Sequence, residues 1–266
     1  MPEPSAPAPA TAIRVAFAAT GVANLASIQA AFRRAGAEPF LASTPDELAS
    51  AAFAVVPGVG AFGSAMAALL ASGMDEAIRD HITRKCPTAG VCVGMQLFFE
   101  ASEESPGVAG LGILQGTLRR FPSDLPVPQL GWNRVFELRS NTAERGSARD
   151  KPSLDSAERS SAGDNPSIIN TALTNNAERS SARDKPLGIP RFVREGWAYF
   201  ANSYRMIEAP AGCLASYATY GESFVAALET DGLLLCQFHP ELSGPWGLEL
   251  IRSWLRTPAC RVGGAT

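Results

Sequence analysis

The sequence predicts an α/β protein with a doubly wound, mostly parallel sheet that is flanked by helices and extended by antiparallel strands. Two observations support this fold class. In the first half of the chain, short apolar strand-like runs alternate with helical stretches, an order typical of parallel strands covered by helices on both faces. In the second half, strand-like runs follow one another directly, and Asp231-Gly232 is a typical hairpin turn between two of them.

Most elements of the first half carry a local signal. Residues 13–18 form an apolar run, and Gly36 closes the helix that follows, because glycine readily adopts the left-handed conformation that ends helices. Thr44, Pro45 and Glu47 combine an N-cap, an N1 proline and an N3 glutamate, which together open another helix. The predicted strands are 13–18, 38–42 and 53–56, and the other predicted helices are 24–36, 61–72 and 74–85.

The second half contains strands and one unusual insert. Residues 139–188 hold three unevenly spaced copies of a polar decapeptide that offers no apolar face to bury, which excludes a solenoid. We expect a disordered low-complexity insert in a surface loop, with a charged docking arm as the alternative. The predicted strands are 112–118, 132–138, 197–206, 213–220, 224–229 and 233–238, and the last helix is 246–255. The predicted organisation is one domain over 12–257, interrupted by that insert, with a disordered tail at 1–11 and a second tail at 258–266.

Composition excludes several classes of function. The chain has 266 residues, of which 46% are hydrophobic, so it is long enough for a proper core. A formal net charge of −3 without a basic stripe argues against nucleic acid or an anionic membrane as a partner, and no apolar stretch could span a bilayer. The N-terminus lacks the pattern of a signal peptide. Five widely spaced cysteines without a CxxC pair predict neither a disulfide framework nor a zinc site, which fits a reducing cytoplasm.

The motif Gly90-Val91-Cys92-Val93-Gly94 lies between an apolar run and a helical pattern. This is the layout of a nucleophile elbow, in which a strand turns sharply into a helix and presents one side chain. The glycines leave room where neighbouring backbone crowds the turn. A helix N-terminus would favour the Cys92 thiolate, and the N–H of Val93 would point toward a developing oxyanion. The alternative is a buried cysteine beside a strand–helix turn, and the motif alone does not separate the two.

The chain has two histidines that could serve as a base. His81 lies at the margin of an apolar helical stripe, where a structural role is expected. His239 ends an apolar strand, and in extended chain Glu241 would lie on the same side and could orient the imidazole. Pro240 cannot continue a sheet ladder, so we expect the strand to end there and expose the pair. Cys92, His239 and Glu241 are therefore the candidate catalytic residues.

With these residues in place, the chain resembles the class I (triad) glutamine amidotransferases, whose fold is flavodoxin-like. Residues 90–94 with Gln96, and Phe238-His239-Pro240-Glu241, carry that resemblance. Residues 57–66, 127–133 and 199–204 resemble, within the family, the glutaminase subunit of imidazole glycerol phosphate synthase. The resemblance covers nearly all of residues 13–255 outside the insert.

The resemblance implies that Cys92 attacks the amide of the substrate glutamine while His239 and Glu241 handle the protons. It further implies that Gly58, Val59 and Val93 hold the oxyanion, and that Gln96 and Ser203 hold the glutamine. The implied partner is a (β/α)8-barrel cyclase subunit, which receives the ammonia in histidine biosynthesis. Neither a metal nor another cofactor is expected. The chain departs from the family pattern at 19–23 and has Gln129 and Asn202 where histidine is usual, but hydrolysis should survive these changes.

Three alternatives remain open from the sequence. The chain could serve another class I amidotransferase, which identification of the partner would show. It could be a cysteine hydrolase or peptidase of similar fold, which a glutaminase assay would separate. It could also be a decayed, non-catalytic interaction subunit, since the 19–23 segment is altered and the insert is repetitive.

Overall fold

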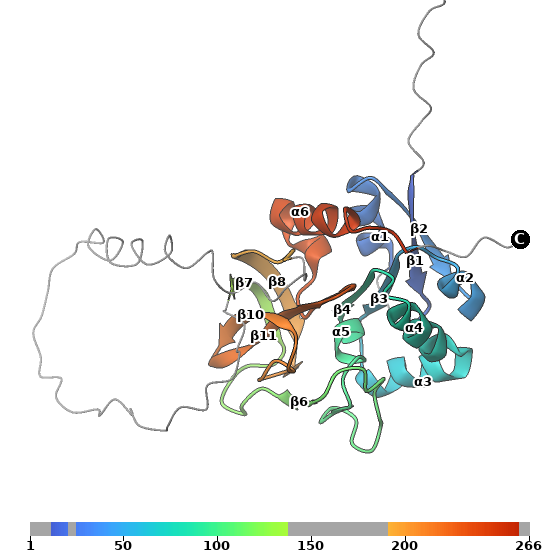
Figure 1. Cartoon of the computed structure of the whole chain (residues 1–266). Coiled ribbons are helices and arrows are strands. Elements are labelled where there is room, and N and C mark those ends of the chain that lie inside the picture. The colour runs from blue at the N-terminus through green and yellow to red at the C-terminus, as the bar shows by residue number, and fades with distance from the viewer. Residues whose placement is uncertain (1–11, 21–24, 138–190, 261–266) are drawn as a thin grey trace, which may run out of the picture. The chain divides into compact units, whose positions relative to one another are not determined.

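The computed structural model describes residues 12–20, 25–137 and 191–260 (Figure 1). The predicted tail at 1–11, residues 21–23 of the altered segment 19–23, and the insert at 139–188 lie outside the described residues. The strands are β1 Ile13–Ala18, β2 Ala37–Ala42, β3 Ala54–Gly58, β4 Thr88–Cys92, β5 Ala101–Ser102, β6 Thr117–Arg120, β7 Gln129–Glu137, β8 Gly196–Asn202, β9 Tyr204–Arg205, β10 Leu214–Tyr220, β11 Glu222–Thr230 and β12 Leu233–Cys236. The helices are α1 Leu25–Arg34, α2 Pro45–Ala49, α3 Phe62–Ser72, α4 Met74–Thr83, α5 Val93–Gln96, α6 Gly244–Leu255 and the 3-10 turn η1 Pro240–Leu242.

The main sheet confirms the predicted fold class. Within the described residues it has nine strands in the order β2-β1-β3-β4-β12-β11-β10-β7-β8. The strands β2, β1, β3, β4 and β12 pair in parallel, and the remaining pairs are antiparallel. The parallel half places the carboxyl ends of β3 and β4 side by side, which is where open α/β sheets bind ligands.

Helices cover both faces of the parallel half (Figure 1). Helix α1 packs against α6, while α2 and α3 pack against α4. Trp254 of α6 lies edge-on to Phe32 of α1 and to Phe53, with ring centroids 6.0 and 5.3 Å apart, and Phe32 in turn meets Phe17 of β1. Each such aromatic pair stabilises by about 0.5–1.5 kcal/mol beyond the area that it buries. The C-terminal helix is therefore part of the core.

The predicted start of α2 and the predicted closing glycine of α1 are both confirmed. The predicted capping box is present: Glu47 N–H donates to Thr44 Oγ1, and Thr44 N–H donates to the Glu47 carboxylate, each at 3.3 Å. Gly36 has a φ of +96° beyond the end of α1, as a helix-closing glycine requires.

Two predicted strands are wrong in extent. The strand expected over 112–118 is reduced to β6, and the chain leaves the extended conformation at Gly112, whose φ is +59°. The strand expected over 197–206 breaks at Ser203, between β8 and β9.

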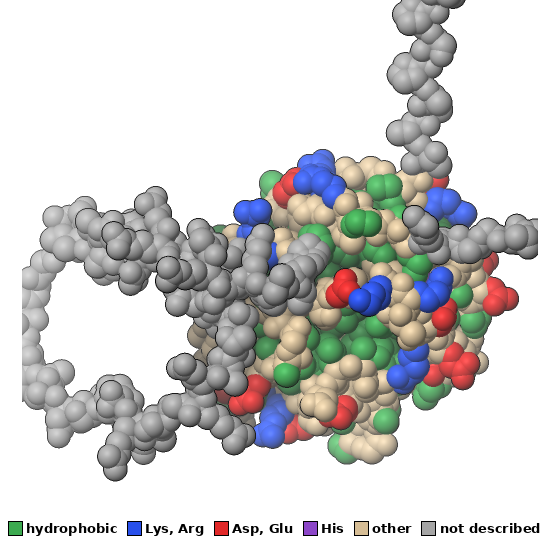
Figure 2. All heavy atoms as spheres, in the orientation of Figure 1, with side chains coloured by type: hydrophobic (Ala, Val, Ile, Leu, Met, Phe, Trp, Pro, Cys, Tyr) green, Lys and Arg blue, Asp and Glu red, His purple; other side chains and the backbone are tan. Residues whose placement is uncertain are grey.

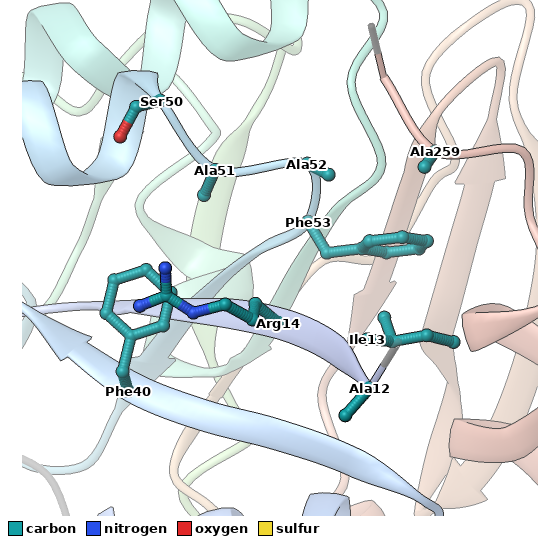
Figure 3. Close-up of a pocket in the computed structure, with 9 residues that line it drawn as sticks. All are labelled: Ala12, Ile13, Arg14, Phe40, Ser50, Ala51, Ala52, Phe53 and Ala259. Carbon is teal, nitrogen blue, oxygen red and sulfur yellow. The ribbon is translucent and has the colours of Figure 1, made fainter. Parts of the chain in front are cut away.

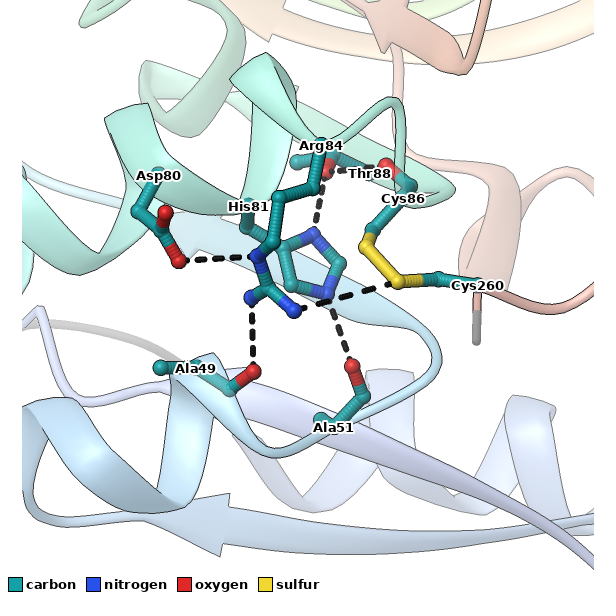
Figure 4. Close-up of a disulfide and its surroundings, with 8 residues drawn as sticks. All are labelled: Ala49, Ala51, Asp80, His81, Arg84, Cys86, Thr88 and Cys260. Atoms are coloured by element: carbon teal, nitrogen blue, oxygen red, sulfur yellow. Dashed lines mark hydrogen bonds and ion pairs between the residues drawn. A yellow bond between two sulfur atoms is a disulfide. The ribbon is translucent and has the colours of Figure 1, made fainter. Parts of the chain in front are cut away.

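A disulfide joins Cys86 to Cys260, which corrects the expectation that the cysteines are unpaired (Figure 4). The two residues are 174 positions apart, with their Cα atoms 4.7 Å from each other. Spacing along the sequence carries no signal for such a pair, because the fold alone returns the end of the chain to the start of β4. Residues 258–260, expected in a tail, are thus attached to the domain. The free cysteines among the described residues are Cys92, Cys213 and Cys236.

His81 is buried and structural, as expected (Figure 4). Its Nε2 lies 3.0 Å from the carbonyl oxygen of Ala51, and its Nδ1 lies 2.8 Å from Thr88 Oγ1. A carbonyl oxygen only accepts, so Nε2 carries the proton of the neutral ring. The Thr88 hydroxyl that faces Nδ1 also donates to the Cys86 carbonyl at 2.9 Å. Burial lowers the pKa of His81, with a smaller opposing effect from the bond to Ala51, so the ring is neutral in the folded protein.

His81 should make the protein less stable in acid. As the pH falls through the ordinary histidine value of 6.5, the unfolded chain gains a proton at His81 while the folded chain does not, so stability is lost below that pH. The loss reaches about 1.4 kcal/mol for each unit of pKa difference. The His81→Gln variant should therefore lose less stability between pH 7.5 and 5.0 than the parent, as measured by urea unfolding at both pH values. An equal loss in both proteins would contradict this.

Charged side chains of both signs are interspersed on the face shown in Figure 2. Lys and Arg lie beside Asp and Glu there and do not gather into one field, which agrees with the lack of a basic stripe in the sequence. Among the described residues, no helix is both long and apolar enough to cross a membrane.

Candidate active site

Cys92 stands at a sharp strand-to-helix turn. It is the last residue of β4, and α5 begins at the next residue. Its φ of +54° and ψ of −116° are unusual for a residue with a Cβ atom, a form of strain that occurs at nucleophile elbows. A Cβ on Gly94 would lie 1.9 Å from the carbonyl oxygen of Val56, and one on Gly90 would lie 2.7 Å from Leu235 Cδ2. Close packing against backbone thus requires glycine at 94, whereas at 90 the nearest obstacle is a leucine side chain.

The helix after the elbow is shorter than the sequence suggests. Helix α5 ends at Gln96 after a single turn. The dipole of so short a helix is small, so it contributes little to stabilising a thiolate on Cys92. Another positive group is needed near the sulfur.

His239 supplies that group. Its Nδ1 lies 2.9 Å from Glu241 Oε1, and both side chains are 8% exposed. The pair is formed differently from the prediction: Glu241 lies in η1, so a tight turn and not extended chain brings the two together, and the pair is buried and not exposed. The backbone fixes the ring position, because His239 N–H donates to the Tyr199 carbonyl at 2.8 Å.

The charge on His239 is set by its two partners. Burial alone would lower its pKa, but hydrogen bonds to Cys92 and Glu241, together with their negative charges, outweigh burial and raise the pKa to about 10. His239 is therefore protonated at neutral pH, as an imidazolium beside Cys92 and Glu241.

The end of β3 lies against the elbow. Gly58 pairs with Cys92 in the parallel register, and a Cβ on Gly58 would lie 2.4 Å from Gly94 N and 2.8 Å from Val93 Cβ. The backbone of Gly58 is thus packed directly against Cys92, Val93 and Gly94 of the elbow. Gly60 follows with a φ of +97°, so the turn after β3 also depends on glycine.

A cavity of about 270 Å³ opens beside His239. Its volume is close to the lower end of the range for small-molecule sites, which is about 300–1,000 Å³. It is lined by Ser27, Ile28, Pro57, Gly58, Val59, Val91, Leu130, Tyr199, Ala201, His239, Glu241 and Leu242. Of the predicted site residues, the structure brings Gly58, Val59, His239 and Glu241 to this cavity. Cys92, Val93, Gln96 and Ser203 are not among its lining residues, although Val91 and His239, which neighbour Cys92, are.

The family model for class-I glutamine amidotransferases matches residues 28–256. The chain belongs to this family. Proteins named imidazole glycerol phosphate synthase subunit HisH are similar over most of the chain: that of Symbiobacterium thermophilum is 31% identical, covering 91% of this chain and 93% of its own, and that of Methanothermobacter thermautotrophicus is 32% identical, covering 88% and 94%. A third, from a Synechococcus strain, is 32% identical and covers 96% and 98%.

Solved structures show the same fold at low sequence identity. A glutamine amidotransferase aligns with a TM-score of 0.60 at 14% identity, covering 91% of this chain and 96% of its own. A putative GMP synthase component from Thermoplasma acidophilum aligns with a TM-score of 0.56 at 15% identity, covering 92% and 94%. The nucleophile elbow of this amidotransferase chain therefore sits on a fold that the family shares.

A second, slightly larger cavity of about 310 Å³ lies at the opposite end of the parallel strands (Figure 3). It adjoins the start of β1 and the loop before β3, and Arg14 packs there over the ring of Phe40. Its lining contains no cysteine, histidine or carboxylate. Despite its size, this cavity lacks the chemistry of an amidotransferase site, so the cavity beside His239 is the candidate active site.

The candidate site contains a residue that the sequence did not point to. Gln237 is fully buried, and its Nε2 lies 3.9 Å from Cys92 Sγ. Gln96 points to Gln237 and not into the cavity, because its Nε2 donates to Gln237 Oε1 at 2.9 Å. A usable signal existed, since Gln237 is the one polar residue in the otherwise apolar run 233–238. Ser203 is half-buried at the end of β8, where its carbonyl accepts from Phe121 N–H.

Proposed function

We propose that this chain is the glutaminase subunit of an imidazole glycerol phosphate synthase, which hydrolyses glutamine and passes ammonia to a cyclase subunit in histidine biosynthesis. The observation that carries the proposal is the strained elbow at Cys92 beside the buried pair of His239 and Glu241, whose Nδ1 and Oε1 lie 2.9 Å apart at the cavity. Membership of the family and the relatives that bear this subunit's name support the choice of reaction. Such a biosynthetic enzyme would act in the cytoplasm.

The first half of the reaction forms a thioester. The Cys92 thiolate attacks the side-chain carbonyl carbon of glutamine, and the electron pair of the C=O bond moves onto oxygen. N–H groups of Val93 and of the Gly58–Val59 segment stabilise that oxyanion. As the carbonyl re-forms, the C–N bond breaks, and protonated His239 gives its proton to the departing nitrogen, which leaves as ammonia.

The second half releases glutamate. His239, now neutral, takes a proton from water, and the resulting hydroxide attacks the thioester carbonyl. The C–S bond then breaks and its electron pair returns to sulfur, which regenerates the thiolate beside an imidazolium. Glu241 transfers no proton in either half; it holds Nδ1 in place and stabilises the positive charge.

The mouth of the cavity provides a surface for the cyclase. Leu130, Val59 and Leu242 line the cavity and are also exposed, with 69% of Leu130 accessible. Trp132 is 55% exposed beside them, edge-on to Tyr199 of the cavity wall. An apolar rim around a catalytic cavity favours a protein partner that covers it. A covering subunit would keep released ammonia out of bulk water.

Glutaminase activity should therefore rise when the cyclase binds. We expect the full chain alone to hydrolyse glutamine slowly, and the rate to increase by at least about tenfold with the cyclase and its ribonucleotide present, because closure of the rim would secure the Gly58–Val59 donors near the oxyanion. Glutamate release, measured with the chain alone, with the cyclase, and with the liganded cyclase, tests this.

Two variants make that experiment specific. Trp132→Ala should raise the cyclase concentration needed for half-maximal activation, because it removes part of the apolar rim. Leu70→Ala removes an equally exposed apolar side chain on α3, outside the cavity lining, and should leave activation unchanged. Equal glutaminase rates with and without liganded cyclase would overturn the proposed partner. Activation by a different synthase would assign the chain to another amidotransferase, and hydrolysis of esters or peptides without glutaminase activity would make it a cysteine hydrolase.

A further inference from the structure

Two buried glutamines form a row of amide groups that ends at the nucleophile. Gln96 Nε2 donates to the backbone carbonyl of Tyr204 at 3.3 Å and to Gln237 Oε1 at 2.9 Å. Gln237 Nε2 in turn faces Cys92 Sγ at 3.9 Å. We propose that Gln237 is a hydrogen-bond donor to the Cys92 thiolate and that Gln96 is a positioning residue that holds Gln237 in the donating orientation. The inference deepens the proposed glutaminase function and rests on it.

The Tyr204 carbonyl, at the end of the row away from Cys92, determines which way each amide group points. The oxygen and nitrogen of a side-chain amide have nearly the same shape, so either could face a neighbour. The Tyr204 carbonyl can only accept, so Gln96 must turn its NH2 group that way. The same NH2 group meets Gln237, which must therefore present its oxygen to Gln96. The NH2 group of Gln237 is then left facing the sulfur.

Burial makes the reversed orientation of the Gln237 amide energetically costly. Gln237 is fully buried and Gln96 is 3% exposed, so water does not replace a lost partner. A buried amide without a hydrogen bond is costly, and a reversed Gln237 would place its oxygen against Cys92 and its NH2 group against that of Gln96. Asn202 Nδ2 also donates to the Tyr204 carbonyl, at 3.0 Å, which holds the carbonyl in place.

An N–H donor at the sulfur favours the anion over the neutral thiol, because a hydrogen bond to a charged acceptor is the stronger one. It therefore assists the start of the reaction, when the thiolate must be present. It assists the end as well, because the electron pair of the breaking C–S bond returns to the sulfur that Gln237 faces. His239 moves protons on one side of the sulfur, and Gln237 donates without transferring its proton.

The test is the pH dependence of Cys92 alkylation by iodoacetamide in the full chain, with the modified cysteine identified by peptide mass spectrometry. Gln237→Met keeps the length of the side chain but removes the donor. It should slow alkylation at pH 7 by about tenfold and raise the pH of half-maximal rate by about one unit. Gln237→Glu keeps the size and an acceptor for Gln96 but sets a carboxylate against the sulfur, so its shift should be larger, about a hundredfold in rate.

Two further variants separate the donor role from packing. Gln96→Met should shift the profile in the same direction by about threefold, because Gln237 loses the group that orients it. Gln129→Met removes another buried glutamine amide, which has no bond to Cys92, and should leave the profile within about twofold of the parent. Melting temperatures identify any variant that fails to fold; if Gln237→Glu fails, Gln237→Met and Gln96→Met decide.

A parent-like pH profile in folded Gln237→Met and Gln96→Met would overturn the inference, even if their rates fall equally at every pH. This failure is distinct from failure of the proposed function. If the parent chain with liganded cyclase does not hydrolyse glutamine, the proposed function is wrong, whereas the alkylation profiles still report whether Gln237 donates to the sulfur.

Discussion

The Cys92→Ala variant is expected to hydrolyse glutamine at less than about one thousandth of the parent rate while remaining folded. The substitution removes the sulfur that forms the thioester, and no other free cysteine among the described residues lies at the elbow: Cys213 and Cys236 are elsewhere, and burial raises the pKa of both thiols. The fold should persist because the strained φ of +54° is the same for alanine as for cysteine. Glutamate release in the presence of liganded cyclase, together with thermal unfolding, checks both halves of this expectation.

Cys213→Ala is the matched control. It removes a free thiol from a half-buried position away from the cavity and should leave the rate unchanged. If purified, folded Cys92→Ala retained glutaminase activity, the assignment of Cys92 as the nucleophile would be wrong, and so would the proposed mechanism.

The Gly94→Ala variant should lose activity and at least about 3 kcal/mol of stability. The added Cβ would lie 1.9 Å from the Val56 carbonyl oxygen and 3.1 Å from Pro57 C, and both belong to the backbone of β3. Strand β3 cannot move away without leaving its place between β1 and β4. Relief of the contact would shift the elbow and the Gly58 segment together. Urea unfolding and the Cys92 alkylation rate measure the two effects.

Gly63→Ala offers a comparison on α3. There the nearest atom to an added Cβ is the hydroxyl oxygen of Ser105, 2.8 Å away, a side-chain atom that can move at the cost of its hydrogen bond from Gly63 N–H. The loss of stability should therefore be about 1 kcal/mol, well below that of Gly94→Ala. If Gly94→Ala proves as mild as Gly63→Ala, the close packing of the elbow is not the reason for its glycine.

The features that the sequence predicted correctly are determined by residues that lie close together along the chain. The capping box at Thr44, the closing glycine at Gly36 and the elbow glycines act within a few residues of where they stand, so their patterns are visible in one dimension. The alternation of strands and helices likewise predicts the parallel half of the sheet. The candidates Cys92, His239 and Glu241 came from residue type and spacing; the structure pairs His239 with Glu241, and the catalytic roles of all three stay predictions.

What the sequence missed depends on long-range folding. Cys86 and Cys260 meet only because α6 packs across the sheet and returns the chain to β4. Gln237 and Gln96 are 141 positions apart, so neither neighbourhood indicates their bond. The geometry of His239 and Glu241 was misjudged for a local reason, since Pro240 opens a 3-10 turn where extended chain was expected. The roles of Gly58, Val59, Val93, Gln96 and Ser203 stay predictions, as do those of the three catalytic candidates.

The strand order divides the chain in a way that the continuous sequence conceals. Residues before position 138 supply β2, β1, β3, β4 and β7, while residues after 190 supply β12, β11 and β10, which lie between β4 and β7, and β8 at the edge. A single peptide-bond cut between 138 and 190 would yield two fragments whose strands interdigitate. Cys92 would lie on one fragment and His239 with Glu241 on the other, so neither could react alone. The fold is therefore suited to fragment complementation. Glutaminase activity recovered on mixing the two fragments would report that they have reassociated.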